Sequence, residues 1–392
     1  MVVYELGELC TWAKGASIPR EETDSSKSCA YLHYGDLYKK YDFRLNLEDK
    51  YLEIIKIDDI SKIKSEQYLR SGDIVFALTS ETVEDLGHCT LIINSMEKSF
   101  VSGMETTVIH INNQKEVIPA YLNYFFHSDY FQKQLRQYVT GMKVYRVHPK
   151  DLMKLKIDLP EYAVQKLVVS VLDGFSDKIL LNSKINDNLL IQCKAQYHQL
   201  LRKSESTVLL SDLAEVCYGK DHKSLNDGKI PVYGSGGVMR YAEKALYSGK
   251  ESVLIPRKGS LNNIMYVCEP FWSVDTMFYT KMKNEWVGKY LYFFLAEYDL
   301  AGMNIGSAVP SMTTELLNAI EIPYPGDIVL KSFDHTIQPL FNQIWLNKKE
   351  CTHLASIRDS ILPKLLSGEI DVSSLRESQL NNHLSQNQGE SI

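Results

Sequence analysis

The sequence predicts an α+β protein made of two copies of one unit, in which a variable domain is followed by a long helix. Two segments of the chain match each other without a gap, each ends in apolar residues at helical spacing, and each is preceded by short runs typical of strands and helices. A length of 392 residues also exceeds one ordinary hydrophobic core. We therefore expect an α+β repeat of two similar domains, each followed by a long helix that contributes to a coiled-coil strut.

The repeat is clearest in its second part. Residues 141–201 match residues 306–366 at a constant offset of 165, and "ILLN" at 179–182 resembles "IWLN" at 344–347. Weaker matches at other offsets lie upstream, where "YLNYFF" from Tyr121 resembles "YLYFFL" from Tyr290 and "ELGELC" from Glu5 resembles "DLAEVC" from Asp212. The predicted boundaries are 1–160 and 206–325 for the domains, 161–205 and 326–370 for the helices, and 371–392 for a polar tail that we expect to be disordered.

Each helical segment carries apolar residues spaced alternately by three and four, which is the pattern of a coiled-coil seam and equally of core packing in a helical hairpin. The predicted helix-pairing residues are Leu172, Phe175, Ile179, Asn182 and Leu189 in the first segment and Ile344, Asn347, Leu354 and Arg358 in the second. Gly174 and Pro339 are equivalent, so we expect a kink or break there and helices over about 175–201 and 340–362. Antiparallel pairing then places Asn182 opposite Asp359, beside Arg358.

Short patterns predict the elements of each domain in order. The runs "SGDIVFAL" from Ser71 and "ESVLIPRKGS" from Glu251 are typical of strands that leave a turn. Helices are expected over 120–139 and 288–298, and the runs "LKIDLP" and "AIEIPYP" predict a closing strand before each long helix.

Composition excludes several classes of protein. A hydrophobic content of 44% with 23% charged residues is typical of a folded protein, and no window approaches eighteen uninterrupted apolar residues, so we expect a cytoplasmic protein without a membrane segment or signal peptide. The seven cysteines are never spaced as Cys-x-x-Cys and the ten histidines form no His-x-x-x-His pair, which disfavours disulfides and metal sites. A net charge of −6 argues against wrapping by nucleic acid but permits a basic patch.

The glycine-rich stretch "VYGSGGVMRY" at 232–241 raises the question of a phosphate-binding loop. A P-loop requires Lys and Ser/Thr directly after its last glycine, whereas Val238 and Met239 follow Gly237 here. The dinucleotide pattern also fails, because Met239 stands where its third glycine belongs. The stretch therefore predicts a turn between two strands.

No catalytic pattern in the chain is convincing. The Glu-x-Lys triplet at 48–50 lacks the preceding Pro-Asp of nucleases, and no Pro-Pro run of an amino-methyltransferase is present. Turns and strand ends instead carry groups suited to DNA, since arginine can contact guanine through two hydrogen bonds and lysine more often holds a phosphate. The predicted DNA-binding residues are Lys14, Tyr34, Lys143, Arg146, Lys220, Lys223, Ser235, Arg257 and Lys258, with Lys14, Lys220 and Lys223 at equivalent starts of the two domains. For each one alone, a solvated surface group is the simpler interpretation.

Several stretches in combination resemble the specificity subunit of type I restriction-modification enzymes. They are "YLHYGDLYKKY" from Tyr31, residues 230–267, "FWSVDTMFY" from Phe271 and "LPKLLSGEIDV" from Leu362. The resemblance implies a pseudo-twofold repeat in which two target recognition domains each read one half of a bipartite site in double-stranded DNA. The domains are separated by two long antiparallel helices, a coiled-coil strut that serves as spacer and as docking surface for two modification subunits. The resemblance also implies that S-adenosylmethionine, Mg²⁺ and ATP bind to partners, which methylate adenine or, in a restriction subunit, translocate and cleave DNA. This chain would then not be an enzyme.

Two alternatives stay open. The same repeat suits a scaffold that binds only protein, and a nuclease or methyltransferase fused into the chain is a third hypothesis. Salt-dependent binding to duplex DNA separates a DNA reader from the scaffold, since phosphate contacts release counterions. Methyl transfer to DNA by the isolated chain would reveal the fused enzyme.

Overall fold

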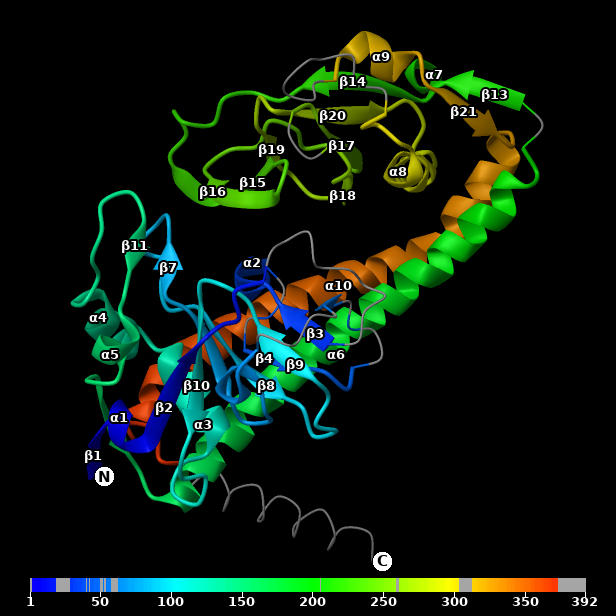
Figure 1. The fold of residues 1–392 in the computed structure, drawn as a ribbon. Helices are drawn as coiled ribbons and strands as arrows, with labels where there is room; N and C mark the ends of the chain where they lie inside the picture. Colours follow the sequence, from blue (N-terminus) through cyan, green and yellow to red (C-terminus); the bar gives the residue numbers. More distant parts are fainter. Residues whose placement is uncertain are drawn as a thin grey trace, which may run out of the picture. The chain divides into compact units, whose positions relative to one another are not determined.

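The computed structural model describes residues 2–18, 29–39, 41, 43–49, 52, 54–57, 63–204, 206–258, 261–302 and 312–372. These residues form two compact units (Figure 1). Unit 1 holds the chain up to Leu180 together with the chain from Glu350 onward, and unit 2 holds residues 181–349. Each long helix therefore contributes one part to each unit. The predicted tail at 371–392 lies almost wholly outside the described residues.

Unit 1 is built on a five-stranded sheet. Its strand order is β2 (Cys10–Lys14), β10 (Thr106–Ile111), β6 (Ile74–Ala77), β8 (Cys89–Ile93) and β4 (Arg44–Asn46). All neighbours pair antiparallel except β4 and β8. The central strand β6 is the one predicted from Ser71, and all four of its residues are buried because its sequence, "IVFA", is apolar on both faces. A second sheet has the order β5 (Ile55–Ile57), β3 (Cys29–Leu32) and β9 (Phe100–Ser102).

Aromatic helices pack against this sheet. Helix α3 (Pro119–Phe126) has proline at its start, packs on β8 and is buried over most of its length. Helix α4 (Asp129–Arg136) follows Ser128, whose hydroxyl accepts a 3.2 Å hydrogen bond from the amide of Phe131. The prediction of one helix over 120–139 is therefore wrong, because the Ser128 cap starts a new helix in the middle of that range. The remaining elements of unit 1 are α1 (Leu6–Leu9), α2 (Tyr34–Lys39), α5 (Pro149–Leu152), a 3-10 turn (Ser65–Gln67), β7 (Thr79–Ser80) and β11 (Tyr145–Arg146).

Unit 2 repeats this α+β arrangement with smaller sheets. The four-stranded sheet has the order β14 (Ala214–Tyr218), β20 (Met277–Met282), β17 (Ser252–Pro256) and β18 (Met265–Val267). The three-stranded sheet has the order β16 (Gly237–Ala242), β15 (Asp227–Gly234) and β19 (Trp272–Ser273). Helix α8 (Gly288–Glu297) packs on β17 and β18, and the short helices are α7 (Leu210–Leu213) and α9 (Thr314–Asn318). The strand predicted from Glu251 and the helix predicted from Gly288 are confirmed.

A strand pair closes each domain beside its long helix. β1 (Val2–Glu5) pairs antiparallel with β12 (Lys156–Leu159), and β13 (Ser206–Leu209) pairs antiparallel with β21 (Glu321–Tyr324). Helices α6 (Tyr162–Leu201) and α10 (Asp327–Leu366) follow, with 40 residues each. At 1.5 Å per residue each helix is about 60 Å long. The predicted offset of 165 residues relates the bounds of both closing strands and of both helices.

Neither long helix breaks at Gly174 or Pro339, so the expected break and the expected helix starts are wrong. Each helix begins 13 residues earlier than expected, at 162 in place of 175 and at 327 in place of 340. Pro339 is exposed, and Ile337 and Phe341 on either side of it are buried in the core of unit 2. A proline inside a helix costs about 3 kcal/mol, and burial of two large apolar side chains at about 1.5–3 kcal/mol each offsets that cost.

A buried ammonium group joins three elements of unit 2. The side chain of Lys289 on α8 is completely buried, and its Nζ lies 2.5 Å from Glu251 Oε1 and 2.8 Å from Asp334 Oδ1. The same Nζ lies 5.8 Å from the ring centroid of Tyr266 and 5.9 Å from that of Phe341. Because a buried charge must be paired, this cluster ties α8 to α10 and to the residue before β17.

Candidate nucleic-acid interface

Strand ends of unit 2 converge on a loop formed by residues 273–276. The amides of Lys220 and Arg257 each donate a 2.8 Å hydrogen bond to a carbonyl of this loop, and the loop donates a 3.0 Å bond to the carbonyl of Tyr233. Side chains that follow β14, β15 and β17 are thereby brought to one edge of the domain. Loops at the ends of a rigid sheet are common places for binding residues.

Arg257 and Tyr218 form a stacked pair at this edge. The guanidinium carbon lies 5.2 Å from the ring centroid of Tyr218, and Nη1 donates to the carbonyl oxygen of Asp275 over 3.3 Å. Tyr218 is 48% exposed and Arg257 is half-buried, so the pair presents a planar cation over a partly exposed aromatic ring. The exposed lysines on the adjoining turns are Lys220, Lys223 and Lys258.

The glycine-rich stretch is the turn of a β-hairpin, as predicted. Strands β15 and β16 pair antiparallel up to Gly234 and Gly237, and Gly237 has a φ of 115°, which glycine adopts readily. The Nδ2 of Asn263 donates to the carbonyl of Ser235 over 2.7 Å and anchors the turn. A strand follows the last glycine where a phosphate loop would be followed by a helix.

Unit 1 builds its corresponding edge around an equivalent glycine. Gly15 and Gly219 each donate their amide over 3.0 Å to the first residue of the strand that follows the loop. A Cβ on either glycine would collide with a loop carbonyl, that of Gly103 or of Val274, so both positions require glycine. The two units therefore share one backbone frame at this edge.

This equivalence corrects the alignment of the two domain starts. Lys14 and Tyr218 directly precede the two glycines and correspond to each other, whereas the sequence comparison grouped Lys14 with Lys220 and Lys223. The predicted match of "ELGELC" with "DLAEVC" aligns Cys10 with Cys217, an offset of 207 residues. The equivalent glycines, Gly15 and Gly219, are 204 residues apart, so the predicted alignment is wrong by three residues. Cys10 and Ala214 occupy the same buried position, which either small side chain fills equally well.

A groove of about 520 Å³ lies at the edge of unit 1. It brings together Lys14 and Arg146, two predicted DNA-binding residues, with Glu105, whose Oε1 lies 4.0 Å from Arg146 Nη2. Lys143 is exposed in the turn before Arg146, and Tyr34 begins α2 and is not among the residues that line the groove. Other polar lining residues are Ser17, Thr79, Thr106, Thr107, Thr140 and His148.

Tyr218 and Glu105 are two residues of these edges that the sequence did not predict. Tyr218 stands directly before a required glycine, and Glu105 lies in "SGMET", a short polar turn between two strands. Both signals were present in the sequence. An exposed tyrosine or glutamate alone does not indicate a binding residue, because both are common on protein surfaces.

The residues predicted to pair the helices lie along α6 and α10. The buried ones are Leu172, Asn182, Ile344, Asn347 and Arg358, and the half-buried ones are Phe175, Ile179, Leu189 and Leu354. In unit 1 the thiol of Cys351 lies 3.6 Å from the carbonyl oxygen of Ile179, and in unit 2 the Nδ2 of Asn347 donates to Asn186 Oδ1 over 2.8 Å. The two helices are therefore antiparallel.

The predicted register between the helices is wrong. It places Ile179 opposite position 362 and Asn186 opposite position 355, whereas the observed partners are 351 and 347. The shift is about two to three helical turns, so Asn182 lies close to position 349 in register and not opposite Asp359. A buried asparagine pair, which specifies alignment, decides the register here.

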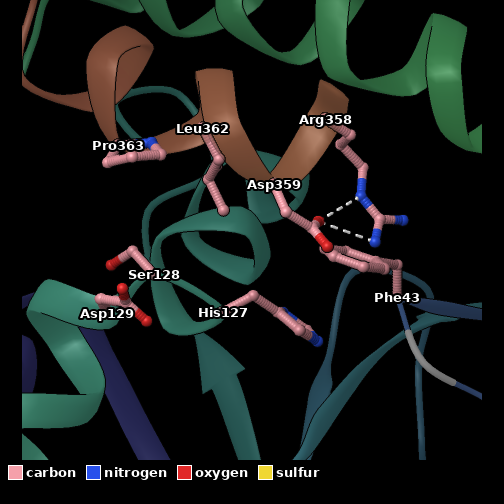
Figure 2. Close-up of a pocket in the computed structure, with 8 residues that line it drawn as sticks. All are labelled: Phe43, His127, Ser128, Asp129, Arg358, Asp359, Leu362 and Pro363. Atoms are coloured by element: carbon pink, nitrogen blue, oxygen red, sulfur yellow. Dashed lines mark hydrogen bonds and ion pairs between the residues drawn. The ribbon is translucent and has the colours of Figure 1, made fainter. Parts of the chain in front are cut away.

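Arg358 lies in a cavity of about 320 Å³ within unit 1 (Figure 2). Its guanidinium carbon lies 3.8 Å from the ring centroid of Phe43, which also stacks on His127 with 4.1 Å between centroids. The Nε of Arg358 donates to Asp359 Oδ1 over 2.9 Å. The other lining residues are Ser128, Asp129, Leu362 and Pro363. The Phe43 ring and the Asp359 carboxylate stabilise this buried cation. Arg358 therefore packs in unit 1 and is not placed beside Asn182, as the predicted register had it.

Two buried cysteines are unsuited to act as nucleophiles. Burial raises the pKa of the Cys10 thiol to about 12 and that of Cys193 to about 11, so both stay protonated at neutral pH and are poor nucleophiles. Within the described ranges, no three His, Cys, Asp or Glu side chains are grouped to hold a metal ion. In that same part of the chain, no helix has both the length and the apolar character needed to cross a membrane.

Comparison with known proteins gives one consistent family. The family model described as type I restriction modification DNA specificity domain matches residues 1–190 and 204–351. A type I specificity subunit of Mycoplasma genitalium is 22% identical over 293 residues, covering 69% of this chain and 76% of that protein. The MjaVIII specificity subunit of Methanocaldococcus jannaschii is 23% identical over 323 residues, covering 69% of this chain and 75% of that protein.

A solved structure shows the same fold. The crystal structure of a type I restriction-modification S subunit from M. genitalium matches with a TM-score of 0.53 at 17% identity, covering 93% of this chain and 95% of that chain. The family model spans most of the sequence, including both variable domains. This chain belongs to the family of type I restriction-modification DNA specificity domains.

Proposed function

We propose that this chain is the DNA-recognition subunit of a type I restriction-modification complex and reads a two-part duplex target, one part with each unit. The observation that supports this most directly is that the two units share one backbone frame but carry different side chains at equivalent positions. Unit 1 has Lys14 where unit 2 has Tyr218, and it has Leu78 where unit 2 has Arg257. The second equivalence follows from the backbone, because the carbonyls of Leu78 and Arg257 each accept a 3.0 Å hydrogen bond from an equivalent amide, that of Val147 or of Met312. Two readers of different base sequences need this combination of a fixed frame with different contact residues.

In this function the chain itself is not catalytic, and its partners carry out the chemistry. Two modification subunits bind S-adenosylmethionine and methylate adenine, and a restriction subunit uses ATP and Mg²⁺ to cleave DNA. Exposed apolar side chains on α6 and α10 support docking of partners there, because such side chains stay in water unless a partner covers them. These side chains are Leu180, Leu181, Ile185, Ile191 and Leu346.

The long helices also suit a spacer between the two readers. Each runs for 40 residues without a break, and the two pack antiparallel through a partly buried contact in unit 1 and a buried one in unit 2. A continuous helix has a fixed rise and rotation per residue, so it can define a separation along a duplex.

Salt-dependent binding of the full chain to DNA tests this proposal. A labelled duplex pool with randomised sequence should bind with an affinity that falls linearly with the logarithm of salt concentration, since each phosphate contact releases a counterion. Lys14→Ala should reduce that slope by about one, whereas Lys166→Ala on α6, which removes the same charge outside the groove, should leave it unchanged. Binding that shows no salt slope would favour a scaffold that contacts only protein.

Exchange of one domain tests the two-part target. Replacing residues 1–155 with the first domain of another specificity subunit should change one half of the methylated site in a host that also expresses the modification subunit. A change in both halves would contradict two independent readers.

A further inference from the structure

A strained turn lies at the edge of the groove in unit 1. Residues 103–106 form a turn in which the amide of Thr106 donates to the carbonyl of Gly103 over 3.3 Å and its hydroxyl donates to the same oxygen over 2.7 Å. Glu105, the third residue of this turn, has a φ of 66°. Side chains with a Cβ are disfavoured in this left-handed region, and turns that require it usually have glycine at that position.

The repeat shows that the fold does not require this strain. The equivalent turn in unit 2, residues 274–277, closes with the same amide-to-carbonyl bond over 3.0 Å. Thr276 stands there in place of Glu105, and among the described residues only Glu97 and Glu105 combine a side chain with a positive φ. The left-handed conformation is therefore specific to unit 1, and strain of this kind accumulates where function needs it.

The strained turn points a carboxylate into a cationic groove. Glu105 and Arg146 are 42% and 62% exposed, with their charged atoms 4.0 Å apart, and Lys14 lines the same groove. A carboxylate repels phosphate, so it weakens binding to every DNA sequence unless it meets a hydrogen-bond donor. In the major groove the amino group of cytosine is such a donor, with no acceptor beside it on the same base.

We propose that Glu105 is a specificity-determining residue that accepts a hydrogen bond from the amino group of a cytosine in the half-site read by unit 1. This inference rests on the proposed DNA-reading function. Arg146 acts as the positioning residue, since its charge holds the carboxylate at the groove edge. A thymine at the same place presents its O4 acceptor to the carboxylate and is rejected.

Selection from a randomised duplex library by the full chain tests the inference, with Glu105→Gln and Glu105→Gly beside the wild type. The wild type should select a C·G pair at one position of one half-site. Glu105→Gly, which removes the acceptor, should lose that preference by about tenfold or more, the size of one base-edge contact. Glu105→Gln keeps an amide oxygen as acceptor but loses the charge, so it should lose less, and both variants should keep every other selected position. Glu105→Gly should also melt at a higher temperature than the wild type, because glycine relieves the left-handed strain.

Glu97→Gly is the matched control. Glu97 has a φ of 52° and does not line this groove, so its replacement should also raise the melting temperature while the selected target stays unchanged. Unchanged selection in both Glu105 variants would overturn the inference. A uniform rise in affinity for all sequences in Glu105→Gln would do the same, because the carboxylate would then only offset the charge of Arg146. A wild-type chain that binds no duplex would instead contradict the proposed function itself.

Discussion

Replacing Arg257 with alanine tests whether unit 2 reads a base edge. In the folded protein the guanidinium makes one stacking contact, at 5.2 Å from the Tyr218 ring centroid, and one hydrogen bond of 3.3 Å to the carbonyl of Asp275. An exposed cation–π contact is worth about 0.5–1 kcal/mol and a hydrogen bond about 0.5–1.5 kcal/mol. We therefore expect Arg257→Ala to lower the free energy of unfolding by about 1–2.5 kcal/mol and to leave unit 2 folded.

The expected loss in DNA binding depends on sequence. A bidentate contact with guanine is worth about 1–3 kcal/mol, or about 5- to 150-fold in affinity. This loss should fall on a duplex that carries the selected target and be small on a scrambled duplex, where the side chain has no matching base edge. Arg257→Lys should lose most of the same preference, because an ammonium group lacks the planar fork that matches guanine.

Fluorescence anisotropy with both duplexes over a salt series measures these effects. Lys258→Ala removes the same charge from the next residue, which is exposed, and serves as the matched control. It should weaken binding to both duplexes alike and reduce the salt slope by about one. An equal loss of affinity on the two duplexes in Arg257→Ala would refute base reading and assign Arg257 to positioning on phosphate.

Three further predictions concern pH, stability and spacing. The 2.9 Å hydrogen bond between His110 Nδ1 and Asp73 Oδ1 raises the pKa of His110. The stability that this bond adds is fully present below the pKa of His110 in the unfolded chain, about 6.5, and is lost as pH rises through the higher pKa of His110 in the folded protein. Denaturant titrations over this pH range should therefore show the loss in the wild type and not in His110→Gln. Lys289→Met leaves the carboxylates of Glu251 and Asp334 without their cation and should cost about 3–5 kcal/mol in urea unfolding, whereas a loss below about 1 kcal/mol would contradict the cluster's role. Matched four-residue insertions in α6 and α10 add about 6 Å and should lengthen the gap between methylated half-sites by one or two base pairs, while an unchanged gap would show that the helices are not a spacer.

Local patterns in the sequence were enough to predict the repeat and the type of most of its helices and strands. The offset of 165 residues relates the bounds of both long helices and both closing strands, because a gapless match over a helix preserves which residues face the core. The strand from Ser71, the helix from Gly288 and the glycine-rich hairpin also follow from local patterns. Each of these features depends on residues close together in the chain, so a short window contains the information.

How segments far apart in the chain meet depends on contacts that exist only in the folded protein. In the folded protein α10 continues through Pro339, Asn186 and Asn347 pair across the two helices, and Arg358 lies over the ring of Phe43. The fold also brings Lys14 and Arg146 to one groove with Glu105 and shows that Lys14 corresponds to Tyr218. Helical periodicity is a property of one segment and is equally satisfied after a shift by whole turns. The register depends on contacts with a second segment far along the chain. The energy of those contacts depends on how the two segments pack together, which neither sequence segment specifies alone.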